Sequence, residues 1–196
     1  MRKIILTLTL LCSTQLFAED LKAILDRTVQ LNTEGKHSKA LKELDWAKQE
    51  IMKGYTAKLN TFFPDEIEGF KATAAVENSG ALGFTNAERN YKNGNVSVKL
   101  SLTGGSGGAA AGGLAGLAQL GQMAAMFGGQ QPGQEMTRIQ GRTVQVEGKK
   151  DSVEATLFLE SGSILKAEVS HSADAEVAKK VLTAMKLDDL DSYIKG

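Results

Sequence analysis

An uncharged, glycine-rich tract interrupts the second half of the chain and constrains what the chain can fold into. Residues 100–134 contain no Asp, Glu, Lys or Arg, and residues 104–133 hold 11 of the 21 glycines in the 196-residue chain. Glycine costs about 1 kcal/mol per residue in a helix relative to alanine, so residues 104–113 are not expected to be helical in water. The tract exceeds ordinary loop length, which indicates that it is either functional or disordered.

Alternation of apolar and polar residues on both sides of this tract predicts an antiparallel β-sheet. Residues 96–103 alternate strictly and follow the hairpin turn signal Asn93-Gly94. Three further segments beyond the tract, separated by turn residues, predict a meander. The strand candidates are residues 69–75, 89–91, 96–103, 143–147, 153–159 and 164–169. We therefore expect a sheet of about five strands that is buried on one face and polar on the other.

Apolar residues at helical spacing predict two helices before the sheet and one after it. Residues 21–31 carry their apolar side chains on one helical face, and a second helix begins near Ser38 and ends before Pro64. The last helix begins near Ser172 or Asp174 and is expected to lie across the sheet.

The single tryptophan does not lie on the main apolar face of the second helix. At 100° per residue, Trp46 is on the side opposite Leu44, Ala47 and Ile51. A tryptophan there needs a second surface to cover it, because most tryptophans are largely buried. We predict interdomain packing of Trp46 against the sheet, and an exposed anchor for a partner is the alternative.

The second helix and the turn before it carry small and large apolar residues at a regular spacing. These residues are Gly35, His37, Ala40, Leu44 and Ala47. The spacing resembles the second half of a tetratricopeptide unit over about one helix, although Met52 stands where that motif places proline. Arrays of such units need stacked neighbours, and the sequence contains one unit, so the resemblance implies a helical hairpin without a peptide-binding groove.

The order of the predicted elements after residue 63 is two strands, the insertion, a three-stranded meander and a helix. Over roughly residues 63–196 this order resembles the PsbP/Mog1-like α/β/α sandwich of small exported bacterial proteins. The resemblance implies a non-catalytic accessory role, which members of that family largely have. We predict an α+β fold in which a helical hairpin, residues 19–62, packs on a sheet domain, residues 63–196, that contains the insertion 104–134 and ends in a helix.

The N-terminus has the pattern of a removable export signal. Residues 2–3 are basic, residues 4–11 are apolar, and Ala18 ends a cleavage site. Removal of residues 1–18 would also remove Cys12, the only cysteine. An exported chain without disulfides fits a bacterial periplasm better than an animal secretory pathway, so we predict a periplasmic or secreted protein.

Charge and histidine content argue against nucleic-acid binding and against catalysis. The chain has 23 basic and 23 acidic side chains, and so lacks the basic excess of a nucleic-acid binder. The only histidines are His37 and His171, and His171 lies near Glu168 and Asp174 in the sequence. Such a strand-end group could form only a weak metal or acid–base cluster. We predict a protein that is not an enzyme and has no cofactor or metal.

The insertion is the segment to which we assign the function. Gly104, Gly108, Gly112 and Gly116 recur every four residues, as in glycine-zipper membrane segments, and residues 114–127 are the better helix candidate. The expected contact residues are Leu114, Leu117, Leu120, Met123, Met126 and Phe127. A helix that covers the sheet and self-association of the tract are alternatives.

This reasoning predicts a non-catalytic accessory or interaction protein of the bacterial envelope. Its insertion would contact an envelope protein or the membrane surface. The alternative is a carrier of a lipid or small apolar ligand in which the insertion helix acts as a lid.

Overall fold

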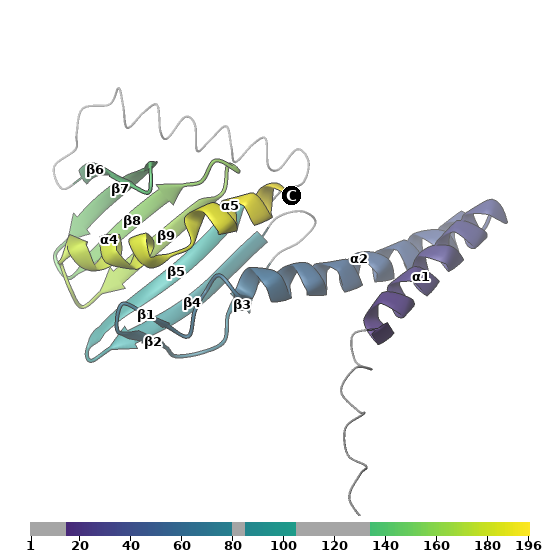
Figure 1. Ribbon diagram of the computed structural model, residues 1–196, viewed down its shortest axis with the longest axis horizontal. Coiled ribbons are helices and arrows are strands. Elements are labelled where there is room, and N and C mark those ends of the chain that lie inside the picture. Colours follow the sequence, from purple (N-terminus) through teal and green to yellow (C-terminus); the bar gives the residue numbers. More distant parts are fainter. Residues whose placement is uncertain (1–14, 80–84, 105–133) are drawn as a thin grey trace, which may run out of the picture. The chain divides into compact units, whose positions relative to one another are not determined.

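The computed structural model describes residues 15–79, 85–104 and 134–196 (Figure 1). Two compact units divide the chain, Met1–Ala57 and Lys58–Gly196. The first 14 residues of the expected export signal, and all but the two end residues of the insertion 104–134, lie outside the described residues. We describe each unit by itself.

A helical hairpin forms the first unit, as the sequence predicts. It consists of α1 (Gln15–Thr33) and the greater part of α2 (His37–Asn60). Gly35 turns the chain between the two helices with φ of 72°, a left-handed conformation that glycine adopts without strain. Ala40 and Ala47 are buried, and Arg27 of α1 pairs with Glu43 of α2 at 3.6 Å. Because alanine side chains are small, Ala40 and Ala47, which are seven residues apart on one face of α2, let α1 approach α2 closely.

A nine-stranded antiparallel sheet dominates the described part of the second unit. Its strands are β1 (Glu66–Ile67), β2 (Phe70–Ala72), β3 (Glu77–Asn78), β4 (Thr85–Asn93), β5 (Val96–Gly104), β6 (Gln134–Ile139), β7 (Arg142–Lys149), β8 (Ser152–Phe158) and β9 (Ile164–Ser170). The order across the sheet is β1-β2-β4-β5-β9-β8-β7-β6, and β3 pairs with β4. Four antiparallel steps separate β5 from β6, so these two strands point in the same direction.

The predicted sheet of about five strands is too small. The sequence indicates β5, β7, β8 and β9 well, because their apolar residues alternate. It misses β1 and β3 because two residues cannot show a period of two. It also misses β6, whose sequence Gln-Glu-Met-Thr-Arg-Ile is mostly polar because the strand lies at an edge of the sheet.

Two short helices end the chain, where the sequence predicts one. They are α4 (Ala175–Ala184) and α5 (Leu187–Lys195). Asp174 caps α4 by accepting a hydrogen bond from the Glu176 amide, and the backbone of Met185 is extended, which ends the helix. The acidic C-terminal segment, residues 188–191, is part of α5, in which Leu190 and Asp191 are buried.

The core of the second unit lies between one face of the sheet and these two helices (Figure 1). Leu100, Leu157 and Leu165 on central strands are 0% exposed, as are Leu182 of α4 and Leu190 of α5. Such side chains each gain about 1.5–3 kcal/mol from burial, so this face is the main source of stability. The buried core of this unit also includes side chains from the C-terminal end of α2 and the turn after it, namely Leu59 and Phe63.

The other face of the sheet is polar. Its residues alternate with the buried ones and are half-buried, as along β8 and β9. Cross-strand ion pairs lie on it, including Lys99–Glu168 at 3.4 Å and Lys166–Glu154 at 2.8 Å. Opposite charges on neighbouring strands each contribute up to about 1 kcal/mol, and this pattern agrees with the predicted polar face.

Gly104, the last residue of β5, lies so close to Ser163 that a residue with a side chain does not fit there. A Cβ added there would lie 2.3 Å from Ser163 Oγ and 2.8 Å from Ser163 Cα. We expect Gly104→Ala to lower the free energy of unfolding by about 1–3 kcal/mol through overpacking. The matched control is Gly148→Ala in β7, where an added Cβ meets nothing within 4 Å. Urea unfolding curves measure both variants, and equal midpoints would contradict this account.

Candidate interaction surface

The exposed large apolar side chains of the described residues all belong to the hairpin. They are Leu25 (39% exposed), Val29 (66%), Leu41 (62%), Leu44 (49%), Trp46 (58%) and Ile51 (55%). The described residues of the sheet unit contribute none. Single exposed apolar residues are normal on a protein surface, but six on one short hairpin mark a contact surface.

Five of the six residues lie on one side of the hairpin. Leu41, Leu44 and Ile51 form a stripe along α2, and Leu25 and Val29 form a stripe along α1. At 100° per residue, the stripe on α2 is rotated about 60° from the line of Ala40 and Ala47, and the stripe on α1 is rotated about 100° in the same sense from its half-buried face. Seen from one end of the hairpin, successive residues turn clockwise in one helix and anticlockwise in the other, because the helices are antiparallel. Rotation in the same sense along each chain therefore places both stripes on the same side of the hairpin. We call these five residues the hairpin face.

Trp46 lies on the reverse side of α2, as its position in the sequence indicates. The hairpin itself leaves it 58% exposed. Its predicted interdomain packing on the sheet stays a prediction.

Sequence reasoning identified Trp46 but missed the hairpin face. A signal for it exists, because residues 41, 44, 48, 51 and 55 follow the alternating three- and four-residue steps of a coiled-coil seam. The contact residues that the sequence predicts in the insertion lie outside the described residues. Those residues are Leu114, Leu117, Leu120, Met123, Met126 and Phe127.

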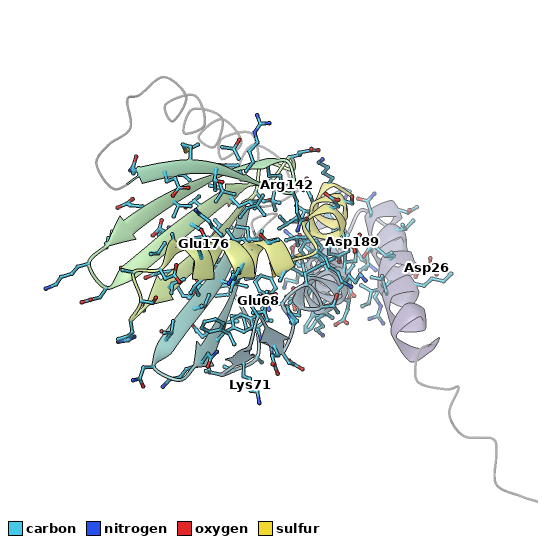
Figure 2. The ribbon with its side chains drawn as sticks, turned by 60° about the vertical axis from the view of Figure 1, so that its left-hand side comes forward. Asp26, Glu68, Lys71, Arg142, Glu176 and Asp189 are labelled. Atoms are coloured by element: carbon cyan, nitrogen blue, oxygen red, sulfur yellow. The ribbon has the colours of Figure 1, made fainter. Side chains whose placement is uncertain are left out.

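The most buried charged group among the described residues of the sheet unit is Asp191 on α5, which lies 3.5 Å from Arg142 (Arg142 is labelled in Figure 2). Its two carboxylate oxygens accept hydrogen bonds from the backbone amides of Ser161, at 2.8 Å, and Glu160, at 3.2 Å. Arg142 lies 3.5 Å from the same carboxylate and pairs with Asp188 at 2.9 Å. Gln140 donates to the last carbonyls of α4. These contacts hold both C-terminal helices against the turns of the sheet.

Other titratable groups also have structural surroundings. Burial raises the pKa of Tyr91 to about 12, with the Arg89 guanidinium 5.9 Å from its ring centre. His171 is exposed and has φ of 63°. Its two sequence neighbours are engaged elsewhere, because Glu168 pairs with Lys99 and Asp174 caps α4. The described residues contain no group of three or more His, Cys, Asp or Glu placed to hold a metal ion.

No protein-family model, curated protein or solved structure matches the chain. Among the helices that the structure describes, none is both long and apolar enough to span a membrane.

The Asp191 carboxylate gives a prediction on stability and pH. Burial raises the pKa of Asp191, but the hydrogen bonds from Ser161 and the charge of Lys195 outweigh burial and hold it below its ordinary value of 3.8. The ionised group therefore stabilises the fold above pH 3.8, and this contribution is lost as pH falls through the lower folded pKa. We expect Asp191→Asn to cost about 1–3 kcal/mol at neutral pH and progressively less in acid, measured by urea unfolding at several pH values.

The control for this experiment is Asp188→Asn, which removes an exposed partner of Arg142. We expect it to cost less than about 1 kcal/mol, as exposed ion pairs do. An Asp191→Asn effect that stayed constant below pH 3.8 would argue against the linkage.

Trp46 fluorescence tests whether another part of the chain covers the reverse side of α2. Because it is the only tryptophan, its emission reports on one position. Within the hairpin the side chain is 58% exposed, so the predicted packing against the sheet should blue-shift its emission and protect it from acrylamide and iodide. Red-shifted emission that both quenchers reduce efficiently would contradict that packing.

Proposed function

We propose that the protein is a non-catalytic accessory or interaction protein of the bacterial envelope. It is exported by residues 1–18, works in the periplasm, and contacts an envelope protein or the membrane surface through the insertion 104–134. The observation that supports this proposal is the distribution of apolar surface. The described sheet unit exposes no large apolar side chain, whereas the hairpin exposes six and the insertion carries no charge.

The sheet unit has the features of a scaffold in this proposal. Its ends at Gly104 and Gln134 fix where the insertion leaves and returns. Binding energy would come from the apolar residues between Leu114 and Phe127, each of which gains about 1.5–3 kcal/mol when fully buried. The glycine-rich arms would provide reach, because such sequences behave as flexible chains.

The resemblances of the sequence fit this proposal. An isolated unit similar to half a tetratricopeptide repeat leaves a face that stacked repeats would cover, and the hairpin face is of that kind.

A carrier of a lipid or apolar ligand has less support. The face of the sheet under α4 and α5 is filled by side chains such as Leu157 and Leu182, both 0% exposed.

Co-sedimentation with vesicles tests the membrane contact. We expect the intact protein to sediment with vesicles of phosphatidylglycerol and phosphatidylcholine, and a variant without residues 105–133 to stay in solution. The replacement needs a flexible linker of about 20 residues. The linker must cross four strand spacings of about 4.8 Å, and the register places Gln134 level with Lys99, five residues back along β5 from Gly104. Equal sedimentation of both proteins would contradict the membrane contact.

A matched pair of variants tests the named contact residues. Leu117→Ser/Leu120→Ser/Phe127→Ser should lose sedimentation, whereas Gln119→Ser/Gln122→Ser should retain it. If the intact protein does not sediment with vesicles, the proposed contact is with an envelope protein. A photoreactive residue placed at Leu117 should then crosslink to that protein in cells. The control position is Lys71, which is exposed on β2 (Figure 2).

A further inference from the structure

We propose that the hairpin is a dimerisation unit in which two copies of this chain pair through their hairpin faces as an antiparallel four-helix bundle. This goes beyond the proposed function, because it assigns a partner to a surface outside the insertion. The dimer through the hairpin faces and the envelope contact through the insertion can each fail without the other.

The spacing along α2 specifies a helix as the occupant. Leu41, Leu44, Lys48, Ile51 and Tyr55 occupy alternating three- and four-residue steps, which are the a and d positions of a heptad. Side chains at these positions insert between side chains of a facing helix. A flat sheet surface does not offer such holes.

The sheet unit of the same chain is a poor match for the hairpin face. Its described residues expose no large apolar side chain, and its open face carries charged and hydroxyl residues such as Lys99, Glu168 and Ser101. Covering the hairpin face with that surface would bury charged groups against leucine, which costs more than it gains.

The charges around the hairpin face match those of a second copy in one register. The Arg27–Glu43 ion pair sets the two helices level, so Ile24, three residues further from the turn, is level with Trp46. A two-fold axis across the helices at this level sets Leu41 against Ile51 of the partner subunit. It also sets Leu44 against Lys48 of the partner subunit.

In this register Lys48 lies next to an acidic residue of the second copy. Lys48 is half-buried and has no ion pair within the described part of its own chain, and Asp45 is exposed at the rim of the face. The axis brings Lys48 next to Asp45 of the partner subunit, and the converse pair forms by symmetry.

The same axis matches charges on α1. Lys22 comes opposite Asp26 of the partner subunit, and Asp26 opposite Lys22 of the partner subunit. Within one chain these two residues pair with each other, and their side chains are 75% and 66% exposed. A shift of the axis by two residues along each helix would instead oppose Lys48 to Lys48 and Lys22 to Lys22. One register is therefore favoured electrostatically.

The available area is that of a weak dimer. Without the export signal, α1 keeps residues 19–33, which extend about 22 Å, and two packed helices present a face roughly 20 Å wide. Pairing would bury about 450 Å² on each copy, or about 900 Å² in total, which is the size of a weak interface and agrees with a monomer–dimer equilibrium.

Sedimentation velocity of the purified protein over a range of concentrations tests the proposal. We expect a monomer–dimer equilibrium, and Leu41→Glu should weaken it about tenfold or more because it places a charge against Ile51 of the partner subunit. Leu41 is 62% exposed in the hairpin, so the variant should keep its fold, which circular dichroism checks. The matched control is Trp46→Ser on the reverse side, which should leave the equilibrium unchanged.

A charge-reversal pair tests the register. Lys48→Glu alone should weaken the dimer because it opposes two acids, and Asp45→Lys/Lys48→Glu should restore it. A monomer at all concentrations, a dimer insensitive to Leu41→Glu, or failure of the double variant to restore association would each overturn the proposal. Loss of the dimer when residues 105–133 are replaced would place the contact in the insertion and would also overturn it.

Discussion

The burial of one face of the antiparallel sheet under α4 and α5 is the constraint on which the rest of the second unit depends. Residues from the central strands and both helices, such as Leu165 and Leu190, are 0% exposed there. The two helices are held by polar contacts as well. Asp191 accepts two backbone hydrogen bonds from the turn between β8 and β9, and Gln140 binds the end of α4. Hydrophobic burial provides the free energy, and these contacts fix the position of the helices.

The separation of roles between the units follows from this packing. A sheet that buries its apolar residues beneath its own helices has a polar remaining surface, as the ion pairs of Lys99 and Lys166 show. The hairpin buries little more than Ala40 and Ala47 between its two helices, so its larger apolar residues stay exposed. A two-helix unit has too small an interior to cover both of its apolar stripes. We therefore propose the hairpin and the insertion as the contact surfaces of the protein.

Local sequence pattern predicted a large part of the fold. The alternation in β5, β8 and β9, the turn at Asn93-Gly94 and the cap at Asp174 each depend on neighbouring residues, so they are visible without the structure. β1, β3 and β6 are not visible in this way, because their pairing partners rather than their own composition make them strands. The break between α4 and α5 was also missed, since apolar residues continue on both sides of Met185.

The sequence by itself determined the secondary structure of the well-patterned segments, the α+β class, and the uncharged tract between two strands. Those features arise from periodicity and composition, which act over a few residues. Only the tertiary structure decided the strand order, the burial of the acidic C-terminal segment, and the exposure of the hairpin face. These depend on which surfaces meet, and Leu41 or Asp191 carries no local sign of whether another segment will cover it.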